Sequence, residues 1–318
     1  MKRFALPLLA ALVVAACSNG SDGNSEAPSG TVALLTVEVP AKNFNGTAAI
    51  TKPASQVFIA ERILNLPAIY ASDHEVTQGE YEIYCMYGGD APSNTYGKGA
   101  RYPAYYVSWY DAIVYCNLRS AADGLTPCYK LGSSIDTKNW TGIVSEGGKY
   151  CGPADSAETS VLNAWNSITF DTTANGWRLP TEAEWEMLAR GGNLAASEGQ
   201  TTYSGSDTIG DVAWYDENSG DNGTSINKKS HEVKAKAKNA LNLYDMSGNV
   251  WEWCWDFSNT IDSNTIWTGP AANLDRYRVS RGGAWYVIGG CSTVANRGQC
   301  PPTLRRNYYG FRVVRNVQ

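Results

Sequence analysis

The chain has 318 residues, of which 43% are hydrophobic and only 18% are charged, so it is long and apolar enough to bury a large core. Its net charge is −5 and it has no basic runs, which argues against nucleic acid and anionic lipid headgroups as partners. The aromatic residues are 11 Trp and 19 Tyr against 6 Phe, so most of them carry a polar group. This composition favours an irregular, loop-rich fold with many side-chain hydrogen bonds.

The first residues in chain order predict export. A basic start is followed by an apolar stretch over 4–16 and by Val14-Ala15-Ala16-Cys17, which resembles a bacterial lipobox. We therefore expect residues 1–16 to be a lipoprotein signal peptide and Cys17 to carry acyl chains, a plain secretory signal being the alternative. Residues 17–30 are mostly small and polar, which predicts a flexible tether. The mature protein is expected at the cell envelope, anchored by lipid in the outer membrane and exposed at the surface.

The regular elements expected after the tether are few. Capping-box spacings at Thr77-x-x-Glu80, Ser108-x-x-Asp111 and Thr181-x-x-Glu184 predict three helix starts. Short runs of β-forming residues predict strands at 34–39, 57–59, 279–280 and 311–314. Long polar connections separate these elements. The pattern predicts an α+β domain with little regular structure.

Apart from Cys17, the cysteines are odd in number, so at least one thiol is unpaired within the chain. Cys128 and Cys151 bracket one loop-like insertion and are the predicted disulfide. Cys116 and Cys254 lie inside apolar patterns and are expected to be buried thiols. No C-x-x-C motif with a matching ligand pair is present, so a zinc site is not expected.

Four motifs occur in a fixed order along the chain. They are Trp-Arg-Leu-Pro-Thr-Glu-Ala-Glu-Trp-Glu at 177–186, the segment at 239–253 that ends Gly-Asn-Val-Trp-Glu-Trp, Arg-Gly-Gly at 281–283 and Gly-Phe-Arg at 310–312. This series resembles the formylglycine-generating-enzyme family, also called the sulfatase-modifying-factor domain. The resemblance implies one domain over residues 31–318. It also implies a C-type-lectin-like fold with small antiparallel sheets, few helices and extensive loops.

The enzymes of that family bind copper with two closely spaced cysteines that follow the Gly-Gly bracket. Here residues 284–288 are Ala-Trp-Tyr-Val-Ile, and Cys291 and Cys300 are not spaced like the enzyme's pair. The iron-dependent relatives need several histidines, but this chain has only His74 and His231, both expected on solvated loops. We therefore expect no catalysis and no catalytic cofactor. The alternative, a copper- and thiol-dependent oxidoreductase, requires Cys291 and Cys300 to approach each other in an open cleft.

The C-terminal segment, residues 281–315, suits recognition better than chemistry. Gly, Trp, Phe and Arg residues at its two ends are typical of a fixed scaffold, and the side chains between them follow neither a helix nor a strand period. This arrangement resembles the diversified segment in variable proteins of diversity-generating retroelements. We expect this segment to bind an unknown protein or glycan ligand, a non-diversified binding member of the family being the other reading. The expected ligand-binding residues are Tyr286, Val287, Ile288, Gly290, Ser292, Gly298, Gln299, Thr303, Arg306, Asn307 and Tyr308.

The resemblance also implies a structural calcium ion in the loop at 245–252. Its ligands would be the Asp245 side chain, the carbonyls of Gly248 and Val250, and the Glu252 carboxylate, a set of oxygen ligands that suits calcium. The alternative makes Glu252 the buried partner of an arginine such as Arg178, with the loop closed by hydrogen bonds alone.

Overall fold

The computed structural model describes residues 35–196, 198–266 and 277–318. The expected signal peptide, Cys17 and the tether lie outside these residues. Within them, no helix is both long and apolar enough to cross a membrane.

The regular elements are short and widely spaced along the described chain. Its α-helices are α1 (Gln78–Tyr84), α2 (Trp109–Ala122), α3 (Thr159–Asn166), α4 (Glu182–Ala189) and α5 (Ile209–Val212). Single 3₁₀ turns are η1 (Thr137–Asn139), η2 (Asp221–Gly223) and η3 (Gly289–Ser292). The strands are β1 (Thr36–Val39), β2 (Lys42–Phe44), β3 (Leu64–Leu66), β4 (Ile69–Ser72), β5 (Tyr129–Lys130), β6 (Val144–Glu146), β7 (Lys149–Cys151), β8 (Thr169–Phe170), β9 (Ala213–Trp214), β10 (Ser247–Gly248), β11 (Trp251–Phe257), β12 (Arg278–Arg281), β13 (Arg297–Cys300), β14 (Tyr309–Gly310) and β15 (Val314–Asn316).

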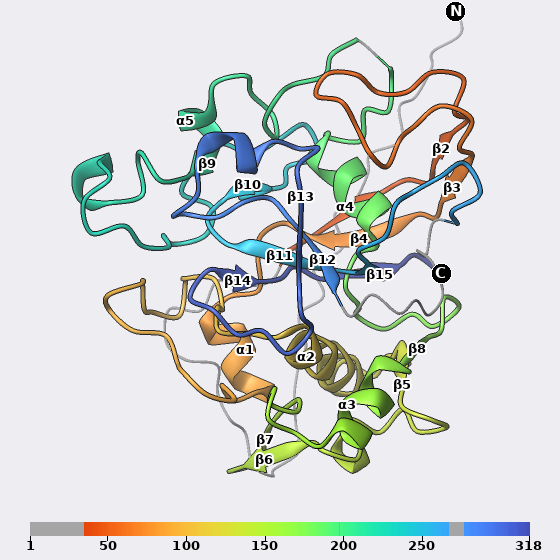
Figure 1. Ribbon diagram of the computed structural model, residues 1–318, viewed down its shortest axis with the longest axis vertical. Coiled ribbons are helices and arrows are strands. Elements are labelled where there is room, and N and C mark those ends of the chain that lie inside the picture. Colours follow the sequence, from red (N-terminus) through yellow and green to blue (C-terminus); the bar gives the residue numbers. More distant parts are fainter. Residues whose placement is uncertain (1–34, 197, 267–276) are drawn as a thin grey trace, which may run out of the picture.

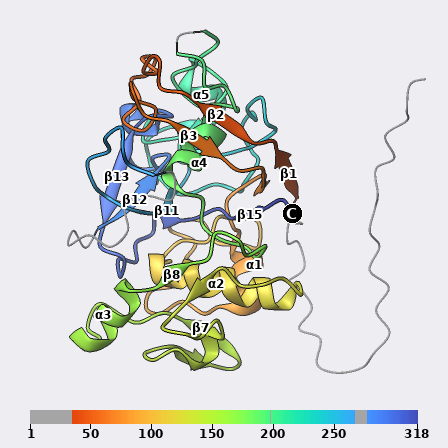
Figure 2. The same ribbon diagram turned by 90° about the vertical axis from the view of Figure 1, so that its right-hand side faces the viewer.

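A four-stranded sheet with the order β13-β12-β11-β14 occupies the middle of the molecule (Figure 1). Its pairs are antiparallel except β11 with β14, which is parallel. A second antiparallel sheet has the order β1-β4-β15. Helix α4 lies on one side of β11 and β12, and α2 lies on the other, as the two views in Figures 1 and 2 agree. The expected class, α+β with small sheets, few helices and long loops, is confirmed.

The three expected helix starts are confirmed. In α1, α2 and α4 the cap hydroxyl accepts the N3 amide while the N3 carboxylate accepts the cap amide, so each capping box is complete. The other two α-helices of the described chain, α3 and α5, have no side-chain cap bond, which is why their starts carry no signal in the sequence.

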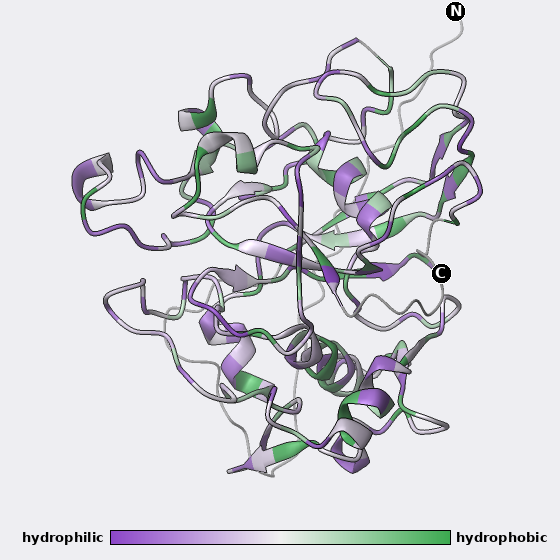
Figure 3. Cartoon of the chain, viewed as in Figure 1, coloured by the Kyte–Doolittle hydropathy of each residue, from purple (hydrophilic) through white to green (hydrophobic). Residues whose placement is uncertain are grey.

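Buried tryptophans tie the loops to the sheet. The indole N–H of Trp109 donates to the Cys254 carbonyl at 2.9 Å, and that of Trp253 donates to the Val107 carbonyl at 2.9 Å. A buried indole needs such a partner, and a buried backbone carbonyl needs a donor, so each bond satisfies two groups. Figure 3 shows hydrophobic and hydrophilic residues interspersed along most of the chain, consistent with a core assembled from many short segments.

Two of the expected strands differ from the structure. Residues 57 and 58 form a bend and residue 59 is irregular, because the Ser55 hydroxyl accepts the amides of Val57 and Phe58 and closes a turn. The C-terminal strand begins only at Val314. Residues 311–313 are extended but bond irregularly to residues 72–76, the Val76 amide for example donating to the Phe311 carbonyl.

The predicted Cys128–Cys151 disulfide is wrong, since both residues are free thiols. The Cys128 thiol instead donates to the Gly176 carbonyl at 3.2 Å, on a different part of the structure from Cys151 at the end of β7. Cys116 and Cys254 are buried thiols, as expected. His74 is fully buried rather than solvated, because its Nδ1 contacts Asp73 and its Nε2 faces Glu80 at 3.6 Å.

Candidate ligand-binding surface

Both ends of the C-terminal segment are fixed by buried arginines. Arg281 contacts Glu186 and donates to the Ala295 carbonyl at 2.8 Å. Arg312 makes a two-point pair with Glu252, at 2.6 and 2.7 Å. A bidentate pair in a buried site holds position and orientation together, so these brackets form a rigid mount.

The two bracket glycines are required by the backbone. Gly282 and Gly283 have φ of +95° and +77°, a region that side chains with a Cβ rarely adopt. A Cβ at Gly283 would also clash with the Ser292 side chain. The chain can therefore turn sharply from β12 into the exposed part of the segment.

The residues expected to hold calcium fit that ion poorly. Both oxygens of Glu252 are engaged by Arg312, and Oε2 also accepts the Trp185 indole N–H at 2.6 Å. Asp245 Oδ2 accepts the Lys234 amide at 2.7 Å. The described residues contain no group of at least three His, Cys, Asp or Glu side chains that could hold a metal. The partner of Glu252 is an arginine, although it is Arg312 and not Arg178, which pairs with Glu184.

Tyr286 and Tyr308 form the most prominent feature of the exposed segment. Their rings lie 4.2 Å apart and tilted, and Tyr308 rests in turn on the buried Tyr309 at 5.3 Å. Tyr286 is 39% exposed and Ile288 is 66% exposed. Arg306 is also exposed, two residues before Tyr308. We call Tyr286, Ile288, Arg306 and Tyr308 the tyrosine surface.

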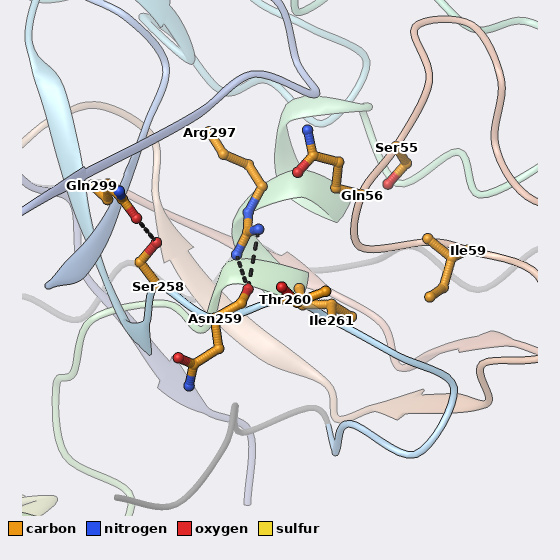
Figure 4. Close-up of a pocket in the computed structure, with 9 residues that line it drawn as sticks. All are labelled: Ser55, Gln56, Ile59, Ser258, Asn259, Thr260, Ile261, Arg297 and Gln299. Carbon is orange, nitrogen blue, oxygen red and sulfur yellow. Dashed lines mark hydrogen bonds between the residues drawn. The ribbon is translucent and has the colours of Figure 1, made fainter. Parts of the chain in front are cut away.

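Strand β13 separates Gln299 from the tyrosine surface. Successive side chains of a strand point to opposite faces, so Arg297 and Gln299 share one face and Gly298 and Cys300 share the other. Gln299 and Arg297 line an open cleft of about 430 Å³, where Gln299 contacts Ser258 (Figure 4). Gly298 instead packs against the Trp251 ring. The expected ligand residues therefore face two different sides of the molecule.

Two other expected ligand residues are buried, and two more are partly exposed and bond to the scaffold through their backbone carbonyls. Ser292 and Thr303 are buried, so their side chains are not available to a ligand in this conformation. The Asn307 carbonyl accepts the Trp285 indole N–H at 3.1 Å, and the Val287 carbonyl accepts the Asp216 amide at 3.1 Å. Gly290 is exposed but has no side chain to contribute.

Residues far away in the sequence support the tyrosine surface. The Tyr96 ring stacks on Trp285 at 5.9 Å, and the Tyr106 amide donates to the Arg306 carbonyl at 2.8 Å. Tyr106 has a φ of +59°, an unusual backbone conformation for tyrosine. Sequence reasoning missed these residues, and the only signal was the run Tyr-Pro-Ala-Tyr-Tyr at 102–106.

The two thiols of the segment are free and partly buried. Burial raises the pKa of both Cys291 and Cys300, which keeps them in the neutral form. The sulfur of Cys300 is 2.8 Å from the Tyr309 hydroxyl and is half-buried.

Comparison with known proteins identifies the scaffold. The family model described as "Sulfatase-modifying factor enzyme 1-like domain" matches residues 29–317. The chain belongs to this family. The chaperone protein LppX of Paenibacillus barcinonensis is 32% identical over 267 residues, which cover 81% of this chain and 83% of the relative.

The chain resembles both a variable protein and enzymes. The solved structure of Treponema denticola variable protein 1 covers 91% of this chain and 97% of its own, with a TM-score of 0.64 and 29% identity. The formylglycine-generating enzyme of Thermomonospora curvata is 33% identical over 141 residues, which cover only 38% of this chain and 43% of the enzyme. The expected family and its fold are confirmed.

Proposed function

We propose that the protein is a non-catalytic binding member of the sulfatase-modifying-factor family, which captures a protein ligand on the tyrosine surface. The observation that carries this proposal is the Tyr286–Tyr308 pair beside an exposed Ile288 and Arg306, mounted between buried ion pairs. Rigid aromatic groups with a neighbouring arginine are typical hot spots of protein interfaces.

The rigid scaffold favours binding because the contacting side chains are already ordered before the ligand docks. Tyr308 already packs on Tyr309, and Tyr286 already packs on Tyr308. Side chains that are fixed before association lose less conformational entropy on binding. Similarity to variable protein 1 over most of the chain supports the same reading.

The display of this surface is also part of the proposal. Acylated Cys17 and the tether at 17–30 would hold the domain at the cell envelope, and residues between 286 and 308 would be the diversified positions. The genomic DNA next to the gene tests diversification, which requires a reverse transcriptase gene and a near-copy of the 3′ end of this gene. Absence of both would leave a binding protein with a fixed surface.

Three exposed residues provide the test of ligand capture. Immobilised protein is exposed to detergent-solubilised envelope extract, and retained proteins are quantified by mass spectrometry. The triple variant Tyr286→Ala, Ile288→Ala and Arg306→Ala should weaken capture by at least about 30-fold, the effect of losing one central hot spot of about 2 kcal/mol. The matched control Ile63→Ala removes an isoleucine that is 68% exposed and should leave capture unchanged.

Thermal stability separates binding from folding in this test. The altered side chains are exposed, so the melting temperature of the triple variant should stay close to that of the wild type. A collapse of the melting temperature would show that these side chains hold the fold. Equal capture by the triple variant and the Ile63→Ala control would overturn the proposal.

The competing enzymatic function predicts copper binding. A formylglycine-generating oxidoreductase would hold Cu(I) stoichiometrically through Cys291 and Cys300. Because residues 284–288, where the first cysteine is expected, contain no cysteine, we expect no stoichiometric Cu(I) after dialysis. Retention of one equivalent that is lost in Cys291→Ser or Cys300→Ser would contradict a non-catalytic function.

A further inference from the structure

A cavity of about 270 Å³ lies between helix α3, the start of α2 and the turn at 301–303. It is distinct from the tyrosine surface, although Pro301, Pro302 and Thr303 belong to the same C-terminal segment. Pockets for drug-sized ligands start at about 300 Å³, so this cavity suits a single ring and not an extended chain.

One side of the cavity is apolar and aromatic. Leu162 of α3, Pro301 and Pro302 line it, together with Tyr277, whose ring is 44% exposed. Such a wall can cover the C–H face of a ring without demanding hydrogen bonds.

The other side is polar and partly fixed in place. Asp155 Oδ1 accepts the Thr303 hydroxyl at 2.7 Å, and Asn166 Oδ1 accepts the Tyr110 hydroxyl at 2.8 Å. Within the described chain, these bonds leave Asp155 Oδ2, the Asn166 amide nitrogen and the whole Asn163 amide without a protein partner. The cavity therefore offers a charged acceptor beside several amide donors.

This combination selects among ligand classes. Asp155 is the only charged side chain among the described lining residues, so an anion would be repelled. A simple ammonium ion would use the carboxylate but leave the amide donors unused. Vicinal hydroxyl groups on a ring both donate and accept, and such a ring also has an apolar face. We propose that this cavity binds a neutral sugar residue.

The roles of the side chains follow from their chemistry. Asp155 accepts hydrogen bonds from sugar hydroxyls, which are stronger than neutral ones because the acceptor is charged. Asn163 and Asn166 donate to hydroxyl oxygens, and Tyr277 covers the ring face. Thr303 and Tyr110 orient Asp155 and Asn166 without needing to touch the sugar.

Saturation-transfer NMR with the purified full-length protein tests this assignment. The probes are glucose, galactose, mannose and N-acetylglucosamine, with glucuronic acid and ethanolamine as the charged comparisons. At least one neutral sugar should show transfer, and its affinity should fall by about tenfold or more in Asp155→Asn and in Asn163→Ala. Both altered residues are exposed, and Asn at 155 can still accept the Thr303 hydroxyl, so the fold should be kept.

The tyrosine-surface variant Tyr286→Ala is the matched control and should leave sugar binding unchanged. This control also separates the two sites, because ligand capture at the tyrosine surface can fail while sugar binding persists. Three results would each overturn the assignment: no transfer to any neutral sugar, transfer unaffected by both cavity variants, or binding of ethanolamine in preference to the sugars.

Discussion

At the scale of single residues, buried charge is arranged in two different ways. Arg178, Arg281 and Arg312 each have a carboxylate partner in the interior. Arg278 is equally buried, but its guanidinium lies over the rings of Trp109 and Phe257 at 3.7 and 3.5 Å. Burial lowers the pKa of Arg278 to about 9. Aromatic faces therefore replace an anion there, which agrees with the surplus of tryptophan in the sequence.

The Arg312–Glu252 pair gives a prediction about stability. Glu252→Gln keeps the shape of the side chain but leaves the charge of Arg312 without its partner. Removing one member of a buried pair costs about 3–5 kcal/mol, so the free energy of unfolding should fall by that order. Urea denaturation followed by tryptophan fluorescence measures it. The control Asp171→Asn breaks the partly exposed pair with Lys130 and should cost about 1 kcal/mol or less.

The same denaturation series tests the expected calcium ion. A metal that binds only the folded protein raises the unfolding free energy with its concentration. Because Arg312 already occupies both oxygens of Glu252, we expect equal stability with calcium and with a chelator. A marked loss of stability in the chelator would show instead that the loop at 245–252 holds an ion.

Asp256 gives a prediction about pH. Burial first, and then repulsion by the Glu182 carboxylate, raise its pKa from 3.8 to about 7. A carboxyl group with a raised folded-state pKa binds its proton more tightly in the folded state. The stabilisation that results from this tighter proton binding is fully present below the pKa of the unfolded state. It is lost as the pH rises through the pKa of the folded state. Wild-type stability should therefore fall between about pH 4 and pH 7, by an amount on the order of a few kcal/mol.

Comparison with Asp256→Asn isolates this residue, because the buried Asp245, with a pKa of about 6, acts in the same direction. Denaturation of both proteins at pH 5 and pH 8 should show a smaller decline in the variant. The exposed control Asp207→Asn should behave like the wild type, since the pKa of Asp207 is lowered below this window. A variant that declines as steeply as the wild type would exclude Asp256 as the cause.

At the scale of elements, helix α2 and the C-terminal segment share one carboxylate. Asp111 closes the capping box of α2 with Ser108, and its two oxygens also accept Arg305 at 2.8 Å each. The carboxylate that caps α2 thus also holds the turn around Arg305, almost two hundred residues later in the chain. The Gly152 amide donates to Asp111 as well, at 2.8 Å, which ties in the insertion before α3.

Asp111→Asn should therefore loosen two elements at once. The Asn side chain has one acceptor oxygen, and its NH₂ group would face another donor, either Arg305 or the cap amide. The cap of α2 and the contact with Arg305 therefore cannot both persist. Hydrogen exchange followed by mass spectrometry should show faster exchange at 301–308 and in the first turn of α2, with α4 unchanged. The control Thr77→Ala removes only the cap of α1, at a cost of about 1 kcal/mol, and should leave 301–308 protected. Unchanged exchange at 301–308 in Asp111→Asn would mean that Arg305 is not what holds this turn.

The elements that could be predicted from sequence were those specified by nearby residues. Three capping boxes each involve residues three positions apart, so they were visible in the sequence. Strand β11 was missed because five of its seven residues are buried, so both faces are covered and the sequence shows no alternation. The division of the C-terminal segment between buried and exposed positions depends on contacts with Trp251, Asp155 and Asp216. Those contacts are long-range, and no spacing within the segment predicts them.

At the scale of the whole molecule, the proposed lipid anchor before residue 35 would determine where the two proposed binding surfaces act. The domain is acidic overall, with a net charge of −5 for the chain, so it has no electrostatic attraction to anionic membranes. In the proposed function, attachment would therefore depend on acyl chains at Cys17. Two or more acyl chains give stable attachment where a single chain is marginal.

Cys17→Ser should accordingly convert a membrane-bound protein into a released one. Cells that produce each form are lysed and separated by ultracentrifugation, and immunoblotting of the pellet and supernatant measures the partition. Wild-type protein should remain in the membrane pellet and the variant should move to the supernatant. Ser18→Ala is the matched control, because it alters the next residue and leaves Cys17 in place. If Cys17→Ser still sediments entirely with membranes in high salt, the anchor must lie elsewhere, and the proposed display of both surfaces on a lipid tether would fail.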